Sequence, residues 1–188
     1  MKSHASAVVL CPPKDCWPAI QAVRERYDRN HRRWMPHVTL LYPFAPSEAY
    51  GNDLIDRLAV ACRSMEPFEA KLCRFRHFSH RGKWNTVWLD PEPADRMVAV
   101  QARLQKAFTD YNDVQRFARG FTPHLTVGQV KDDVRDETLQ SLQDAWSPIT
   151  FRADRIALIW RNDPPDDVFR VYREIVFGTT DVVVPGEE

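Results

Sequence analysis

Long hydrophobic runs are missing from this sequence. No uncharged stretch approaches the roughly 18 apolar residues of a membrane-spanning helix, so we expect no membrane span. The apolar segment from Ala5 to Cys11 is short and runs directly into Pro12 and Pro13. This pattern favours a first strand over a signal peptide.

Cysteine is also scarce. The four cysteines form no C-x-x-C pair and fit no zinc-finger spacing: Cys11, Cys16, Cys62 and Cys73. Free, partly buried thiols of this kind suit a reducing compartment. We therefore expect a cytoplasmic protein, with the nucleus as the alternative.

Net charge is absent as well, because 26 Lys and Arg residues balance 26 Asp and Glu residues. Proteins that coat long nucleic acids are usually basic, since phosphate neutralisation dominates such binding. Neutrality argues against a large nucleic-acid footprint but leaves room for a compact site for one phosphate or one RNA end. The segment 24–33 is locally basic, and we interpret it mainly as solvated surface.

Hydrophobic periodicity predicts alternating strands and helices. The expected strands are 6–11, 37–42, 68–80, 85–90, 124–130, 151–160 and 169–177, and the expected helices are 17–29, 52–65, 95–111 and 135–146. Antiparallel pairs mixed with helices are typical of an α+β fold. Each half of the chain shows a helix, a strand, a helix and a hairpin, which indicates a duplication. We expect residues 1–188 to form one domain of two lobes.

Two short segments share one signature. Residues 36–40 read Pro-His-Val-Thr-Leu, and residues 123–127 read Pro-His-Leu-Thr-Val. Scrambled chains of this composition would contain two copies of His-apolar-Thr-apolar only about once in 600 cases. The repeat is therefore a candidate site rather than a coincidence.

Strand geometry gives the spacing a physical meaning. Side chains at i and i+2 point to the same face, so His37 shares a face with Thr39, and His124 with Thr126. The same alternation would place Gly128 on the second polar face, where it would leave room for a ligand. The apolar residues between them would pack beneath helices.

Two imidazoles in one cleft suit acid–base catalysis on a phosphodiester. Histidine titrates near pH 6.5, so one ring can take a proton from water while the other protonates the leaving oxygen. The Thr hydroxyls can donate hydrogen bonds to the phosphoryl oxygens as charge develops. The sequence shows no cluster of Asp and Glu that would hold Mg²⁺. A metallohydrolase is the less favoured alternative, because two His with no nearby carboxylate make a poor ligand set.

The paired motifs resemble those of the 2H phosphoesterase superfamily, which includes LigT-like RNA 2′,3′-cyclic phosphodiesterases and 2′-5′ RNA ligase-like proteins. The longer strings MPHVTLLYPF and FTPHLTVGQV look most similar to eukaryotic-type members, including 2′-5′ phosphodiesterases like the A-kinase-anchoring-protein group. The resemblance implies a bilobal α+β fold of two antiparallel sheets with helices outside, pseudo-twofold symmetry and a central cleft. It also implies catalysis without a metal or organic cofactor. His37, Thr39, His124 and Thr126 match the functional positions of the motifs.

One position departs from the family pattern. Some LigT-like members carry Arg shortly after the second motif, whereas here the strand continues as Gly128-Gln129. Arg161, at the end of a predicted strand, is a candidate substitute, with a solvated strand end as the alternative. Trp34, Phe44 and Phe121 flank the motifs and are candidate substrate contacts, with core packing as the alternative for each.

Three functional hypotheses remain open from the sequence. The first is a phosphodiesterase that opens 2′,3′-cyclic phosphates of RNA ends or nucleotides, with 2′-5′ oligonucleotide cleavage or 2′-5′ ligation as related alternatives. The second is a catalytically weak RNA-end binding module. The third is the metallohydrolase. The expected partners are RNA ends, cyclic nucleotides or short oligonucleotides, and the expected oligomeric state is a monomer.

Overall fold

The computed structural model describes residues 1–80, 82–115 and 120–185. The strands are β1 (Ser6–Leu10), β2 (Val38–Leu41), β3 (Phe68–Ser79), β4 (Trp84–Glu92), β5 (Leu125–Lys131), β6 (Ile149–Ala153), β7 (Arg155–Trp160), β8 (Arg170–Val176) and β9 (Val182–Val183). The helices are α1 (Trp17–Tyr27), α2 (Asn52–Cys62), α3 (Ala94–Ala107) and α4 (Arg135–Ala145). Short 3₁₀ turns lie at Lys14–Cys16, Ser47–Ala49, Asp113–Gln115 and Asp132–Val134.

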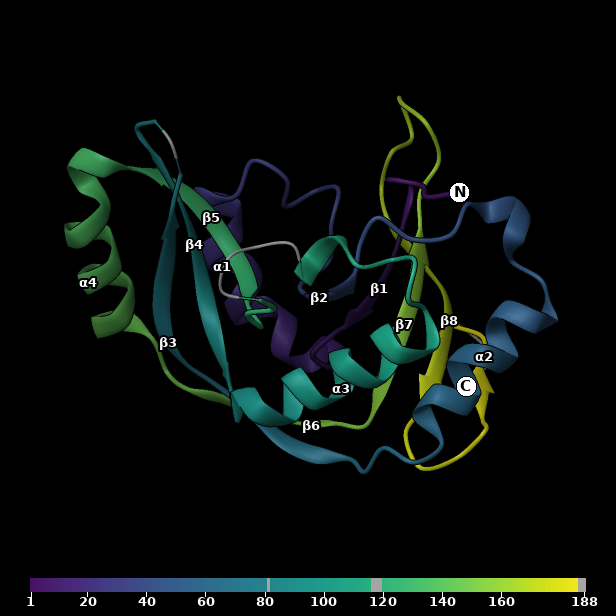
Figure 1. The fold of residues 1–188 in the computed structure, drawn as a ribbon. Helices are drawn as coiled ribbons and strands as arrows, with labels where there is room; N and C mark the ends of the chain where they lie inside the picture. The colour runs from purple at the N-terminus through teal and green to yellow at the C-terminus, as the bar shows by residue number, and fades with distance from the viewer. Residues whose placement is uncertain (81, 116–119, 186–188) are drawn as a thin grey trace.

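The strands of the described residues form one antiparallel sheet with the order β6-β3-β4-β5-β2-β1-β7-β8-β9. The predicted α+β class and antiparallel pairing are confirmed. The two sheets expected from the sequence are joined at the centre by a single pair of residues, Val38 of β2 and Leu125 of β5. The two halves of the sheet correspond to the two lobes, and the motif strands form the seam between them (Figure 1).

Apart from β9 at one edge, the order of strands is symmetric about this seam. From β2 outward come β1, β7 and β8, and from β5 outward come β4, β3 and β6. Helix α1 lies between β1 and β2 in the chain but packs on β5, whereas α3 lies between β4 and β5 but packs on β2. Each half of the chain therefore supplies a helix to the opposite lobe, as expected for a pseudo-twofold arrangement.

One predicted strand is wrong. The segment 151–160 was expected to form a single strand, but β6 ends at Ala153 and β7 begins at Arg155. The reason is a change of partner, because β6 pairs with β3 in one lobe and β7 pairs with β1 in the other. The other helices and strands match their predicted ranges with shifted ends; α1, for example, ends at Tyr27 rather than at residue 29.

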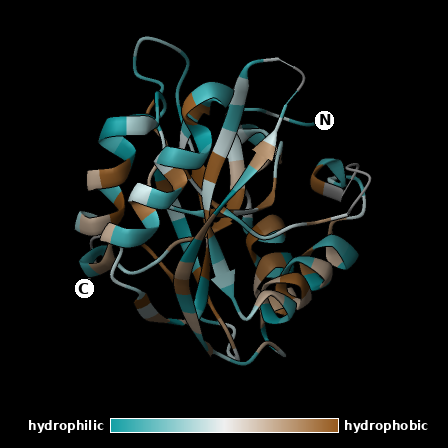
Figure 2. Cartoon of the chain, turned by 90° about the vertical axis from the view of Figure 1, so that its left-hand side faces the viewer, coloured by the Kyte–Doolittle hydropathy of each residue, from teal (hydrophilic) through white to brown (hydrophobic). Residues whose placement is uncertain are grey.

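The main core lies between the sheet and the helices. The predicted stripe of α3 is buried there, with Met97, Val100, Leu104 and Phe108 at most 4% exposed. Figure 2 shows hydrophobic residues gathered in the sheet at the centre and as stripes on the surrounding helices. A smaller apolar cluster covers the opposite face of β1 and β7: Ala7, Val9, Ala157, Ile159 and Phe169. Across the described ranges, no helix is both long and apolar enough to cross a membrane.

Candidate active site

The register of β2 and β5 brings the two motifs together. Val38 is paired with Leu125, and opposite residues of an antiparallel pair have a constant sum of residue numbers. His37 is therefore opposite Thr126, and Thr39 is opposite His124. Val38 and Leu125 face the helix-covered core, so the His and Thr side chains point to the other face of the sheet.

The two histidines are oriented in the same way. Nδ1 of His37 lies 2.7 Å from the carbonyl oxygen of Met35, and Nδ1 of His124 lies 2.8 Å from the carbonyl oxygen of Thr122. A carbonyl accepts only, so each Nδ1 carries the proton when the ring is neutral. This leaves Nε2 of each ring as the basic nitrogen, free to exchange a proton with a ligand.

Burial changes the titration of both rings. It lowers the pKa of His37 to about 4, and the positive charges of Arg24 and His124 act in the same direction. The hydrogen bond to Met35 and the charge of Asp28 oppose this effect. Burial also lowers the pKa of His124 below its ordinary value, against the hydrogen bond to Thr122. Both rings are therefore neutral near pH 7 before a ligand binds.

Aromatic residues fix the position of His37. Its ring stacks on Trp34 with the centroids 4.9 Å apart, and Trp34 stacks on Phe169 at 3.7 Å. Tyr42 meets the edge of Trp34. The guanidinium of Arg161 lies 5.7 Å from the centroid of the Phe169 ring. Trp34 and Arg161 thus lie on the His37 side of the site, and their contact with a substrate stays a prediction.

His124 has an aromatic wall of its own, which was not predicted from the sequence. Phe78 of β3 meets the His124 ring edge-on at 5.1 Å, and Trp88 of β4 meets it at 5.9 Å. Phe78 and Trp88 stack on each other at 4.8 Å. Trp88 is the cross-strand partner of Thr126, so the register of β4 and β5 was the signal that could have identified it.

A buried polar network lies behind His37. The guanidinium of Arg24 donates to Oδ2 of Asp28 at 2.9 Å and to the carbonyl oxygen of Trp34 at 2.8 Å. Both members of this ion pair are almost fully buried, with side chains 2% and 3% exposed. Oδ1 of Asp28 accepts a hydrogen bond from Gln129 of β5 at 3.2 Å. The network connects α1, the segment that leads to the first motif, and the strand of the second motif.

The two flanking phenylalanines, Phe44 and Phe121, belong to the main core or pack against it. Phe44 is fully buried among Phe108 and Tyr111, so the alternative of core packing holds and it cannot contact a substrate directly. Phe121 is partly buried and packs against the same core, and a substrate contact there stays a prediction.

The expectation for Gly128 is wrong. A bulge between β4 and β5 interrupts the alternation, because Val87 is paired with Gly128 and Trp88 with Thr126. Gly128 consequently faces the helices, where an added Cβ would lie 2.4 Å from the Cβ of Tyr27. The glycine leaves room for the end of α1 rather than for a ligand.

Metal-ligating side chains are scattered rather than clustered. Within the described ranges, no group of three or more His, Cys, Asp or Glu side chains is placed so that it could hold a metal ion. The chemistry that the motif residues offer is proton transfer by two imidazoles and hydrogen bonding by two hydroxyls.

Comparisons with known proteins identify the family of the chain. The family model described as the 2′-5′ RNA ligase superfamily matches residues 12–165. A presumptive phosphoesterase of Bacillus licheniformis is 26% identical over 172 residues, covering 91% of this chain and 97% of that protein. A similar protein of Oceanobacillus iheyensis is 24% identical over 172 residues, covering 91% and 96%.

Solved structures share the fold. The protein TT0787 of Thermus thermophilus superposes with a TM-score of 0.61 at 17% identity, covering 95% of this chain and 99% of that one. Escherichia coli LigT, solved in complex with 3′-AMP, superposes with a TM-score of 0.57 at 12% identity, covering 94% and 99%. The two relatives and the two proteins of similar fold are bacterial, and a eukaryotic-type subgroup stays a prediction.

Proposed function

The chain belongs to the 2′-5′ RNA ligase superfamily, and on this premise we propose that it is a phosphodiesterase that opens 2′,3′-cyclic phosphates of RNA ends or nucleotides to 2′-phosphates. Phosphoesterase relatives over 91% of the chain support the general activity. The cyclic-phosphate reaction is the specific step of the proposal.

One observation carries the proposal. Both histidines bind a backbone carbonyl through Nδ1, two residues before the ring in each case, so that both basic nitrogens are Nε2. Histidines that serve only to pack the core would not require the same Nδ1 hydrogen bond in both motifs. An in-line displacement needs two proton-transfer groups on opposite sides of the phosphorus, and the pairing of Val38 with Leu125 between the two motifs supports that role for His37 and His124.

The reaction can be written with these residues. Nε2 of His37 removes a proton from water, and the water oxygen attacks phosphorus in line with the 3′-oxygen. The bond between phosphorus and the 3′-oxygen breaks, and Nε2 of His124 donates a proton to that oxygen. The product is a 2′-phosphate with a free 3′-hydroxyl. Thr39 and Thr126 donate hydrogen bonds to the non-bridging oxygens.

The lowered pKa of His37 supports its assignment as the base. Its pKa of about 4 keeps the ring neutral, and the negative charge of a bound phosphate raises that pKa so that Nε2 can accept a proton. His124, whose pKa is also lowered, acts as the acid once the negative charge of a bound phosphate favours its protonated form. No step requires a metal ion or an organic cofactor.

Turnover in the presence of EDTA tests the proposal. The substrates are a 2′,3′-cyclic mononucleotide, an RNA ending in a 2′,3′-cyclic phosphate and a 2′-5′ oligoadenylate. We expect the cyclic substrates to be opened with EDTA present. His37→Ala and His124→Ala should each lower kcat/KM by about 10²-fold or more. His77→Ala, on β3, is the matched control and should retain activity.

Each other outcome selects a different function. Preferential cleavage of the 2′-5′ oligoadenylate would favour 2′-5′ phosphodiesterase or ligase chemistry, which the family description also supports. Binding of RNA ends without turnover would favour a binding module. Loss of activity with EDTA would contradict the metal-independent scheme.

The LigT structures with 3′-AMP and ATP support nucleotides as ligands for this chain. A monomer in the cytoplasm remains our prediction.

A further inference from the structure

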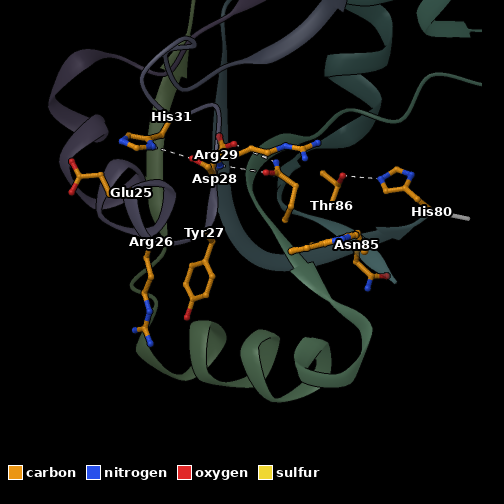
Figure 3. Close-up of a pocket in the computed structure, with 11 residues that line it drawn as sticks. Glu25, Arg26, Tyr27, Asp28, Arg29, His31, His80, Asn85 and Thr86 are labelled. Carbon is orange, nitrogen blue, oxygen red and sulfur yellow. Dashed lines mark hydrogen bonds between the residues drawn. The ribbon is translucent and has the colours of Figure 1, made fainter. Parts of the chain in front are cut away.

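A hollow of about 600 Å³ lies at the end of α1, and its lining contains none of the four motif residues. It is formed by the end of α1 and the residues after it, together with β4, β5 and the end of β3 (Figure 3). Its lining includes Arg29, His31, His80, Trp84, Thr86 and Gln129. A hollow of this volume is within the usual range for a site that holds a small molecule or one nucleotide.

One residue, Phe78, connects the lining of the hollow to His124. Thr86 is the cross-strand partner of Phe78, and Phe78 packs against the ring of His124. Gln129 follows Thr126 by three residues on β5. A chain bound with its reacting phosphate at the two histidines would therefore reach this hollow along the His124 side of the site.

Unpaired positive charge is the second feature of the hollow. Arg26 and Arg29 are exposed, and among the described residues neither forms an ion pair. Two other arginines of the same basic segment are paired, Arg24 with Asp28 and Arg33 with Asp167. Of the five arginines in this segment, Arg24 and Arg33 are in structural ion pairs, and Arg26 and Arg29 line the hollow.

The two arginines point in different directions, because Arg26 points away from Thr86 and His80 in Figure 3. Arg29 extends toward Thr86 and His80 in Figure 3. Nε2 of His80 lies 2.8 Å from the hydroxyl oxygen of Thr86. The carboxylate of Asp28 is neutralised by Arg24, so Glu25 is the remaining acidic group in the lining. An arginine next to a hydroxyl and an imidazole is a suitable arrangement for a phosphate.

An exposed aromatic ring completes the lining. Trp84 is 52% exposed, an unusual amount for a tryptophan, and the ammonium of Lys131 lies 5.9 Å from its ring centroid. Exposed aromatic rings next to basic residues are typical of sites that stack the bases of single-stranded nucleic acids.

We propose that this hollow binds the nucleotide next to the reacting one, with Arg29 on its phosphodiester and Trp84 against its base. The preferred substrate is then an RNA end of two or more nucleotides rather than a free cyclic mononucleotide. This inference rests on the proposed function, because it assumes that the reacting phosphate lies at His37 and His124.

Two substrates of different length test the inference. Adenosine 2′,3′-cyclic phosphate can occupy only the reacting position, whereas a triadenylate ending in a 2′,3′-cyclic phosphate also reaches the hollow. We expect kcat/KM of the wild-type protein to be at least about tenfold higher for the triadenylate. Arg29→Gln should remove most of this advantage while leaving kcat/KM for the mononucleotide within about twofold.

The salt dependence gives an independent measurement. Each phosphate contact of a single strand contributes about 0.7 to the slope of log kcat/KM against log salt concentration, so Arg29→Gln should reduce the slope for the triadenylate by about that amount. Trp84→Ala should lower kcat/KM for the triadenylate without changing the slope. Arg63→Gln, at an exposed position directly after α2, is the matched control and should change neither measurement.

Failure of this inference is distinct from failure of the proposed function. If the mononucleotide is opened but the triadenylate has no advantage, or if Arg63→Gln acts like Arg29→Gln, the hollow is not a nucleotide site. If neither substrate is opened, the proposed function fails, and binding decides about the hollow. A fluorescent triadenylate with a 3′-phosphate should then bind about tenfold more weakly to Arg29→Gln than to the wild type, and equal binding would overturn the inference.

Discussion

Gln129 donates a hydrogen bond to Asp28, with Nε2 of Gln129 3.2 Å from Oδ1 of Asp28. This bond connects the strand of the second motif to the residue that ends α1. The other carboxylate oxygen of Asp28 binds Arg24, which holds the carbonyl of Trp34 next to the first motif. Two motifs that are far apart in the sequence thus share one buried carboxylate.

Removal of this carboxylate should destabilise the protein strongly. Asp28→Ala leaves the buried guanidinium of Arg24 without its counter-charge, so we expect the free energy of unfolding to fall by about 3–5 kcal/mol. Urea denaturation measures the change. Asp167→Ala is the control, because its partner Arg33 is 40% exposed and the loss should not exceed about 1 kcal/mol. Equal losses in the two variants would contradict the structural role of the network.

The stability of the protein should depend on pH through His37. The unfolded ring has a pKa of about 6.5, whereas the folded ring has a pKa of about 4, so the unfolded chain takes up the proton first as pH falls. The stabilisation from the neutral ring is complete above about pH 6.5 and is lost between pH 6.5 and 4. We expect a loss of about 2–3 kcal/mol over this range, since one pKa unit corresponds to about 1.4 kcal/mol.

Denaturant unfolding at pH 7 and pH 5 measures this dependence. His37→Gln removes one of the two rings whose pKa is lowered and should reduce the decline, and His124→Gln should remove part of the remainder. A decline that is the same in His37→Gln would mean that other groups cause it.

The rate should show an acidic pH optimum. The profile of kcat/KM reports the free enzyme, in which the pKa of His37 is about 4 and the pKa of His124 lies below 6.5. The bell should therefore have its maximum below pH 6.5. The kcat profile should lie at higher pH, because a bound anionic phosphate raises the pKa of both rings. A kcat/KM profile with its maximum above pH 7 would contradict the assignment of these two histidines.

Much of this site could be predicted from the sequence because its information is local. The spacing in each motif specified which side chains share a face, and the apolar stripe of α3 specified its buried side. Both follow from the fixed periodicity of strands and helices. That His37 lies opposite Thr126 follows only from the register of β2 and β5, and no local sequence pattern specifies this register.

The features that were missed depend on pairing between distant strands. The bulge between β4 and β5 turns Gly128 away from the polar face, and the break at Asp154 reflects a change of partner strand. The contact of Phe78 and Trp88 with His124 requires three strands in their final register. Each of these is a consequence of tertiary structure rather than of propensity.

The threonine hydroxyls should contribute to catalysis rather than to folding. Thr39→Val and Thr126→Val keep the shape of the side chain on a strand but remove the donor, so we expect kcat to fall by about 10- to 100-fold. Thr→Ser at the same positions keeps the hydroxyl and should retain most of the rate. Steady-state kinetics on a 2′,3′-cyclic nucleotide measures both, and thermal unfolding should show the variants folded. Full kcat in either valine variant would exclude that hydroxyl from the reaction.

Gly128 should be intolerant of even one added methyl group. In Gly128→Ala the Cβ would lie 2.4 Å from the Cβ of Tyr27 and 2.9 Å from its backbone carbon and oxygen. Backbone cannot move aside as a flexible side chain can, so α1 or β5 must shift, and we expect a destabilisation of about 1–3 kcal/mol. Gly51→Ala is the matched control, because nothing lies within 4 Å of its added Cβ and its backbone is extended. As a change at the N-cap of α2, it should cost less than about 1 kcal/mol. Because α1 and β5 also hold Asp28 and Gln129 in contact, Gly128→Ala should lower kcat as well. Unchanged stability of Gly128→Ala would show that α1 packs less closely on β5 than this geometry requires.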